Sequence, residues 1–394
     1  MRMQKKELVY YVAFTLYFVI NMLYTTSINN LFGLIPLSSI STIVTLIIYL
    51  LLGYLLVISI NKKYWLIIIV VLTCALLVTF NTRGNSILSS ILFILTIGKM
   101  NIKKLAKYTF YLNTGIILVA AFCAVGGLLP MHSTVREAHI IYALGFVSYN
   151  TVAIAIFRSI LLYCLIKYES LKVRHFISVF GIGYLTYFLT RSRIAFYTTL
   201  VFLVLLIYSK VRKNAFTSRG FLIVAELILP FFTFISVYYG SVYFLQHDTL
   251  QKLNEFFSGR LYFINYYLTN FGIKIWGQNI FFVSSREGAA TGATWFALDN
   301  SYAYTLVCFG IVITAILFTM YSILIYNAYK NGKKMIFLYL ISMLFVGVTE
   351  NGIFLVAMNF ALLYFMQLLN VKESVLNKRK IFRFKIKRQY PKLG

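Results

Sequence analysis

The sequence predicts an all-α polytopic membrane protein, and three observations support this class. Of the 394 residues, 60% are hydrophobic and only 12% are Asp, Glu, Lys or Arg. Apolar runs of about 20 residues recur along the chain, the length that a helix needs to cross the hydrocarbon core. The net charge of +27 lies mostly in short loops between these runs. Such placement is typical of membrane topology and argues against a nucleic-acid partner.

About twelve membrane spans are expected, forming one transmembrane domain over 1–371. Their approximate bounds are 8–27, 39–60, 64–80, 85–98, 108–129, 142–166, 176–190, 194–209, 220–245, 298–326, 335–349 and 352–370. The fourth is short enough to be tilted or re-entrant. A basic tail, 372–394, mixes cations with Ile and Phe. It is expected either to lie on the anionic inner leaflet or to stay solvated as a topology signal.

The placement of Lys and Arg predicts that both termini are cytoplasmic. One set of alternating loops, the N-terminus and the tail together carry most cations, as the cytoplasmic side of a membrane protein does. Eight cations lie on the opposite, outer side: Arg83, Arg136, Arg191, Arg193, Lys252, Arg260, Lys274 and Arg286. Outer loops normally carry few cations, so this group predicts an anionic ligand at the outer mouth of the helices.

The first candidate site is the turn between the seventh and eighth spans. Ser192 is a suitable N-cap for the eighth helix, whose free N–H groups would then point outward beside Arg191 and Arg193. Two guanidinium groups next to a helix N-terminus form a phosphate-binding arrangement. The alternative is that both arginines extend toward lipid headgroups.

The largest outer loop, 246–297, is expected to contain short interfacial helices and to form part of the active site. Ser258 is a suitable cap for a helix that begins near Arg260. The aromatic residues expected at headgroup depth on this helix are Tyr262, Phe263, Tyr266, Tyr267 and Trp276. Their alternative roles are simple interfacial anchoring or stacking on sugar rings.

Two outer acids are candidate general bases. Asp299 opens the tenth span, where it could instead cap the helix, and Glu350 ends the eleventh, where it could be an ordinary loop acid. Arg136 lies just above the sixth span beside Glu137, and nearby His139 is either a proton-transfer group or a surface residue.

Two further groups of polar residues lie inside predicted spans. Polar residues 148–150 in the sixth span indicate either a hydrated cavity or hydrogen bonds between helices. Arg158 and Glu226 lie at similar distances from the cytoplasmic ends of their spans. This predicts a structural ion pair within the membrane.

Five segments carry a family resemblance. LTRSRIAFYTTLVFLVLL, SGR followed by WGQN, LDNSYAYTLVCFGIV, ALGFVSYNTVA and VGVTENG resemble segments of bacterial Wzy-type polysaccharide polymerases and the related O-antigen ligases. The resemblance covers the chain over 135–355 in order. Two departures concern local geometry: Gln278 and Asn279 follow Gly277 without the second glycine usual in the family, and Tyr149 replaces the usual proline.

The resemblance implies a GT-C-like glycosyltransferase that needs no metal or cofactor. It would transfer a growing capsular or O-antigen glycan from undecaprenyl pyrophosphate to the next lipid-linked repeat, at the outer face of the bacterial cytoplasmic membrane. A flippase and a chain-length regulator would be its partners. Four arginines would bind pyrophosphate: Arg191, Arg193, Arg260 and Arg136. Asp299 or Glu350 would take the acceptor proton. Ser192, Asn300 and Tyr302 would contact substrate.

Three other functions are open at this point. An O-antigen ligase would share these motifs and transfer the finished glycan to a different acceptor. A lipid-linked sugar transporter would favour paired repeats with broken helices, and the sequence shows no clear repeat. A structural scaffold would leave the outer arginines without a role.

Overall fold

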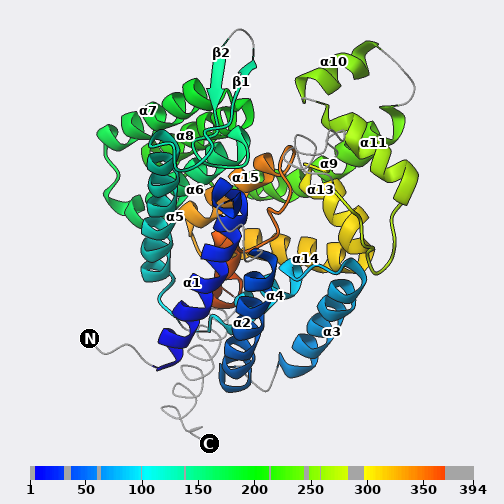
Figure 1. Cartoon of the computed structure of the whole chain (residues 1–394). Coiled ribbons are helices and arrows are strands. Elements are labelled where there is room, and N and C mark those ends of the chain that lie inside the picture. The colour runs from blue at the N-terminus through cyan, green and yellow to red at the C-terminus, as the bar shows by residue number, and fades with distance from the viewer. Residues whose placement is uncertain are drawn as a thin grey trace, which may run out of the picture.

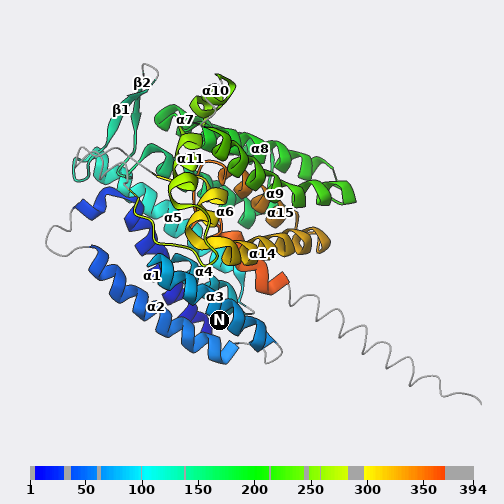
Figure 2. The ribbon, with the colours of Figure 1, turned by 90° about the vertical axis from the view of Figure 1, so that its right-hand side faces the viewer.

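The computed structural model of this chain is nearly all helical, and the chain packs around one apolar core (Figures 1 and 2). The structure describes residues 5–30, 37–59, 64–98, 100–136, 139–212, 214–243, 248–257, 259–282 and 297–368. Within these ranges, eight helices are long and apolar enough to cross a membrane. The predicted class, an all-α polytopic membrane protein, agrees with this architecture.

Most predicted spans are helices. The described ones are α1 (Lys5–Thr25), α2 (Leu37–Ser59), α3 (Trp65–Thr82), α4 (Ser86–Thr96), α5 (Ile102–Val125), α6 (Tyr149–Lys167), α7 (Val173–Thr190), α8 (Arg193–Val211), α9 (Arg219–Val242), α14 (Gly310–Lys330) and α15 (Lys334–Val346). The helices α4 and α15 are apolar but shorter than the eight. Both are buried inside the protein, and irregular backbone continues from α15 at its outer end.

The outer faces of several helices are suited to lipid. Leu50 of α2 is 75% exposed, Phe80 of α3 is 84% exposed and Ile177 of α7 is 66% exposed. Apolar surface on this scale would drive association in water. Its distribution over long apolar helices therefore indicates a membrane-embedded protein.

The expected twelfth span, 352–370, is wrong as a continuous helix. Residues 352–359 form turns, a short 3-10 turn covers Phe360–Leu363, and only 364–368 are α-helical. Ile353, Phe354 and Val356 are at most 2% exposed. Non-helical backbone is tolerated at membrane depth only where protein covers it. This segment, 350–359, runs through the protein interior and is called the inner segment below.

The sixth span begins later than predicted. Residues between α5 and α6 form an antiparallel hairpin of β1 (Ser133–Arg136) and β2 (His139–Tyr142), visible at one end of the molecule in Figure 1. Ser148 then caps α6, and its hydroxyl accepts a hydrogen bond from the backbone N–H of Thr151. Residues 148–150 thus mark the helix start, and the placement of Ser148 inside a span was wrong.

The tenth predicted span is broken near its N-terminal end. It starts as α13 (Ser301–Tyr304), continues as a π-helical turn over Thr305–Phe309, and resumes as α14. The extended chain after α11 crosses this break, where the carbonyl oxygens of Lys274 and Ile275 accept hydrogen bonds from α14. The two backbones approach so closely that a Cβ on Gly310 would lie 2.3 Å from the nitrogen of Gly277.

Gln278 lies at this crossing and links the two crossing segments. The side-chain amide of Gln278 donates hydrogen bonds to the carbonyl oxygens of Gly272 and Val307, both at 3.0 Å. The glutamine therefore ties the loop to the broken helix next to Asn279, where a second glycine was expected. Polar side chains at such breaks satisfy the backbone groups that the helix leaves unpaired.

The outer loop contains two helices, as predicted: α10 (Asp248–Phe256) and α11 (Arg260–Phe271). However, α11 packs against α9, where the backbone of Gly240 lies under Ile264. Tyr267 is 1% and Phe263 9% exposed, so these two rings are core residues, whereas Tyr262 and Tyr266 remain partly exposed. Trp276 lies beyond the helix.

The predicted Arg158–Glu226 ion pair is wrong. Arg158 on α6 donates to the Asn113 side chain, the Ala357 carbonyl oxygen and the Met22 sulfur. Glu226 on α9 lies beside Ser322 of α14. Similar distances from the ends of two predicted spans suggested a pair. They did not show whether the two side chains would meet.

Candidate functional site

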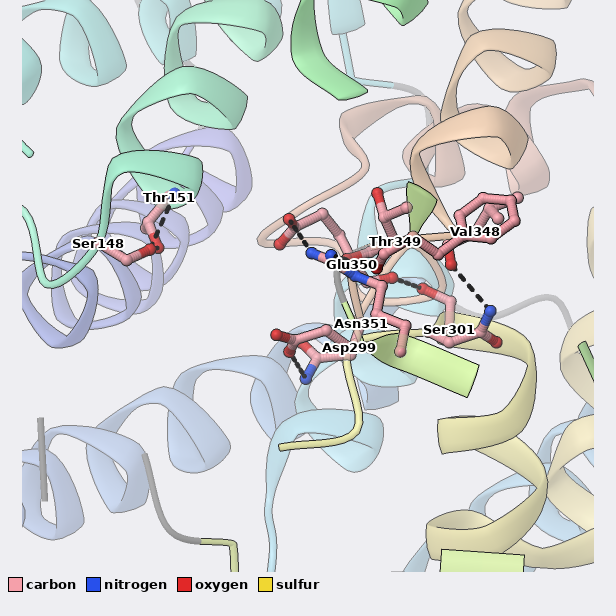
Figure 3. A network of polar contacts seen from close by, with 11 residues as sticks. Ser148, Thr151, Asp299, Ser301, Val348, Thr349, Glu350 and Asn351 are labelled. Carbon is pink, nitrogen blue, oxygen red and sulfur yellow. Dashed lines mark hydrogen bonds and ion pairs between the residues drawn. The ribbon is translucent and has the colours of Figure 1, made fainter. Parts of the chain in front are cut away.

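Three chain segments converge at the candidate site. They are the start of α11 at Arg260, the residues before α13 at Asp299, and the residues after α15 at Glu350. The sequence placed these residues on the same side of the membrane, and the structure brings them into contact (Figure 3).

Arg260 is the centre of this contact. It is the first residue of α11, after Gly259 with a φ of +83°, a backbone conformation that favours glycine. Its Nε donates to the Thr349 carbonyl oxygen at 2.9 Å, and one terminal nitrogen donates to the Phe257 carbonyl oxygen at 3.0 Å. The other terminal nitrogen lies 3.8 Å from the Glu350 carboxylate. This last distance is too long for a hydrogen bond, so the guanidinium still has donor capacity.

A set of hydrogen bonds joins the residues before α13 to those after α15. The Ser301 hydroxyl donates to the Glu350 carbonyl oxygen at 2.6 Å and accepts from the Ile353 N–H at 3.2 Å. The Asn351 amide donates to the Asp299 carboxylate at 3.5 Å. These contacts tie the residues around Asp299 to those around Glu350, as the dashed lines in Figure 3 show.

Asn300 and Tyr302 have structural roles beside these contacts. The Asn300 side-chain oxygen caps α13, accepting from the N–H groups of Tyr302 and Ala303, so the expected alternative of Asp299 as the cap is wrong. The Asn300 amide donates to Ser236 and to the Val348 carbonyl oxygen. Tyr302 is fully buried, and its hydroxyl donates to the Leu344 carbonyl oxygen. The structure gives these two residues internal partners in place of the expected substrate contacts.

The two acids share one electrostatic environment. Burial raises the pKa of Glu350, the negative charge of Asp299 raises it further, and Arg260 opposes this rise. Burial also raises the pKa of Asp299, again opposed by Arg260. Because the two carboxyl groups interact, they titrate as a pair. A carboxylate with a raised pKa is a stronger proton acceptor than one in water, which suits a general base near neutral pH.

A small pocket adjoins Glu350. Its volume is about 170 Å³, and it lies between the end of α1, the start of α6 and the inner segment. The polar side chains that line it come from Thr25, Thr151, Arg158, Glu350 and Asn351. Figure 3 shows Thr151 on the helix that faces Glu350 across this space.

Arg191 and Ser192 form a separate part of the molecule. Arg191 ends α7 with a φ of +49°, and its guanidinium lies over the rings of Tyr187 and Phe188. Ser192 occupies the predicted N-cap position of α8, but its hydroxyl makes no cap bond. Within the described ranges, the Ser192 hydroxyl and the Arg191 Nε are buried without a hydrogen-bond partner.

Arg193 begins α8 and is half-buried. The helix α8 packs against α15, which leads into Thr349 and Glu350. The packed helices α8 and α15 thus connect the turn at 191–193 to the carboxylate site. Among the described contacts, none joins Arg191 directly to Arg260, Asp299 or Glu350.

Other predicted site residues are placed outside this contact. Arg136 lies at the end of β1, where its backbone is paired in register with His139. His139 is exposed on β2. Ser258 lies outside the described residues, as do Glu137 and Arg286. No group of three or more His, Cys, Asp or Glu side chains with metal-binding geometry occurs in the described part of the chain.

Sequence reasoning missed the residues that only the inner segment brings to the site. Asn351 was noted beside Glu350, but its contact with Asp299 was not expected. Thr25 and Thr151 gave no motif signal, because each is an ordinary helix-end residue in the sequence. They become site residues only because α1 ends and α6 begins next to Glu350.

No family model matches this chain. No curated protein and no solved structure matches it either. The site must therefore be interpreted from its own chemistry, in an all-helical protein with eight helices suited to crossing a membrane.

Proposed function

We propose that this protein is a Wzy-like glycosyltransferase that polymerises lipid-linked oligosaccharide repeats at the outer face of the bacterial cytoplasmic membrane. The single observation that carries the proposal is the close approach of Arg260 to the Glu350 carboxylate, with Asp299 near enough to interact electrostatically with both. A cation for a leaving diphosphate and a base for an attacking hydroxyl are the two groups that metal-free glycosyl transfer needs.

The proposed reaction uses both groups together. The oxygen of the acceptor hydroxyl attacks the anomeric carbon of the donor glycan, and its proton passes to the Glu350 or Asp299 carboxylate. The bond from the anomeric carbon to the diphosphate oxygen breaks, and its electron pair leaves with the lipid diphosphate. The guanidinium of Arg260 compensates the charge that grows on this leaving group.

The second cationic turn supports a lipid-linked donor. An apolar groove of about 460 Å³ lies between α5, α6 and α7, and it is lined along α7 from Ser178 to Thr190. At 1.5 Å per residue this is about 18 Å of helix, a large part of the depth of one bilayer. The groove ends beside Arg191, whose buried Nε lacks a partner. An isoprenoid chain in this groove would carry its diphosphate toward the arginines.

An arginine series in the source strain tests the proposal. Arg260→Ala should reduce surface polysaccharide by at least about 100-fold, the usual effect of losing one transition-state donor. Arg191→Ala and Arg193→Ala should also abolish long chains if the turn binds the same diphosphate. Arg260→Lys should restore only part, because Lys binds a phosphate as a point charge and not through two parallel hydrogen bonds.

The readouts are a gel of surface glycan and an extract of lipid-linked intermediates, with membrane insertion checked by immunoblot. Polymer of wild-type length in Arg260→Ala would refute the proposal. Lipid-linked single repeats should accumulate in the inactive variants. Accumulation of long lipid-linked chains would instead assign the protein to the ligase-like transfer of a finished glycan.

A further inference from the structure

The pocket beside Glu350 is assembled from three regions far apart in the sequence. Thr25 is the last residue of α1, Thr151 lies in the first turn of α6, and Asn351 belongs to the inner segment. We infer that this pocket binds the acceptor sugar as a single neutral pyranose ring, with Thr25, Thr151 and Asn351 selecting its hydroxyl groups. This inference rests on the proposed function and names the acceptor subsite of the same centre.

The polar lining matches hydroxyl groups better than it matches an anion. The Thr151 hydroxyl and the Asn351 amide can each donate and accept, whereas the Thr25 hydroxyl donates to the Met22 carbonyl oxygen and can only accept from a ligand. A ring carrying several hydroxyls needs both kinds of partner. Arg158 and Glu350 are the two charged residues of the lining, and their opposite charges leave no excess positive charge that would favour a phosphate. One Glu350 oxygen is buried without a hydrogen-bond partner among the described residues, which leaves it ready to accept from a ligand hydroxyl.

The apolar lining and the size fit one ring. Ile154, Ala155 and Met358 supply apolar surface against which the C–H face of a sugar can pack. The pocket volume of about 170 Å³ is many times the roughly 10–15 Å³ that a single water needs, so there is room for a ligand of the size of one sugar ring.

The floor of the pocket is held in place independently of any ligand. Arg158 lines it and uses its donors on Asn113, Ala357 and Met22, so the inner segment and α6 are fixed to each other. Thr151 contacts Ser148, whose own hydroxyl caps α6 and does not line the pocket. A rigid floor of this kind places a bound hydroxyl next to Glu350 without prior rearrangement.

The chain offers a matched pair of variants for the test. Thr151→Val removes one pocket hydroxyl with little change in shape, and Ser148→Ala removes its hydrogen-bond partner from outside the pocket. Thr151→Ser restores the hydroxyl. Thr25→Val provides a second, independent change on α1.

Binding is measured on full-length protein in nanodiscs by saturation-transfer NMR, with methyl glycosides of glucose, galactose, N-acetylglucosamine and rhamnose as probes. At least one glycoside should bind wild-type protein, and Thr151→Val should weaken this binding by about ten-fold, the usual effect of one lost hydrogen bond. Ser148→Ala and Thr151→Ser should bind as the wild type does. Absence of binding by all four glycosides, or equal binding by Thr151→Val, would overturn the subsite.

The surface-glycan gel separates the two proposals. If Arg260→Ala abolishes polymer while Thr151→Val and Thr25→Val make normal amounts, the subsite is wrong and the transferase stands. If Arg260→Ala leaves polymer unchanged, the proposed function itself is wrong. If Ser148→Ala loses polymer and sugar binding as Thr151→Val does, the threonine acts through the helix cap, and the subsite is refuted.

Discussion

Arg158 and Arg260 are equally buried arginines, each 8% exposed, yet the protein uses them differently. Arg158 gives its hydrogen bonds to Asn113, the Ala357 carbonyl oxygen and Met22, and it contacts no carboxylate among the described residues. Arg260 donates to two carbonyl oxygens and keeps a 3.8 Å approach to the Glu350 carboxylate.

The difference shows how one residue type can be structural in one place and available to a ligand in another. Arg158 reaches the inner segment from α6 inside the helix bundle, where it lines the pocket beside Glu350 but makes four hydrogen bonds to protein groups. Arg260 lies at a junction of loops, where it donates to two carbonyl oxygens and lies 3.8 Å from the Glu350 carboxylate. A buried charge with most of its donors used stabilises the fold, whereas one with remaining donor capacity can bind substrate.

The largest expected effect on the fold is that of Arg158→Ala. This change leaves the Asn113 side-chain oxygen and the Ala357 carbonyl oxygen without their donor. At about 1–3 kcal/mol for each unsatisfied buried acceptor, the free energy of unfolding should fall by about 2–6 kcal/mol. Thermal unfolding in detergent, followed by fluorescence-detected size exclusion, measures this change. A melting temperature equal to that of the wild type would show that Arg158 does not have the structural role that separates it from Arg260.

Arg260→Met sharpens the comparison from the other side. It removes the charge but keeps an unbranched side chain of similar length, so the melting temperature should fall less than in Arg158→Ala. Polysaccharide should still be lost, because methionine cannot donate to a diphosphate. The same thermal assay and the surface-glycan gel are run in parallel. Equal destabilisation of Arg260→Met and Arg158→Ala would assign Arg260 a mainly structural role.

The acid pair next to Arg260 predicts opposite trends of stability and activity with pH. The folded-state pKa of Glu350 is raised, so its contribution to stability is fully present below the unfolded value of about 4.3 and is lost as pH rises through the folded value. Activity should rise over the same interval as the base ionises. Melting temperature and polymer synthesis are measured in membranes from about pH 5 to about pH 9. This interval lies above the unfolded pKa of a glutamate and covers the region in which a raised pKa falls.

Glu350→Gln is the control for this pH dependence. It should flatten the fall of melting temperature with rising pH and abolish or strongly reduce polymer. Asp299→Asn tests the second member of the pair, since the two acids titrate together. If the pH profile of stability were identical in the wild type and both variants, neither acid would be the cause of the pH dependence.

The smallest expected effect is that of Glu226→Gln. The sequence predicted that this change would break an ion pair with Arg158, but Glu226 lies beside Ser322 on α14. Glutamine can keep a hydrogen bond to a serine hydroxyl, so the melting temperature should change by only a few degrees at most. A loss as large as that in Arg158→Ala would restore the ion pair that the structure does not show.

Much of the fold could be predicted because hydropathy and charge act locally. Apolar length predicted α1, α2, α3 and most other helices to within several residues. The capping preference of serine placed Ser192 correctly at the N-cap position of α8, although its hydroxyl makes no cap hydrogen bond. Turn chemistry was harder, because the hairpin at 133–142 and the broken helix before Gly310 depend on contacts with distant segments.

The candidate site was predictable as a set of residues but not as a geometry. Arg260, Asp299 and Glu350 were each identified from their place at the ends of predicted spans, and their contact is a result of the fold. The inner segment was misjudged as a span because it is as apolar as one. It is irregular because its turns are buried against α1, α6 and α14, which satisfy its polar groups.

By itself, the sequence determined that the chain is helical and suited to a membrane. It also predicted that the unusual cations gather at one end of the helices. Both follow from the sequence because helix length and charge asymmetry are properties of local chain composition. The tertiary structure alone decided which arginine meets an acid and which is held by the protein. It also decided that Thr25 and Thr151 share a pocket with Glu350. Those outcomes depend on which helices pack side by side, and residue periodicity carries no information about the choice of neighbour.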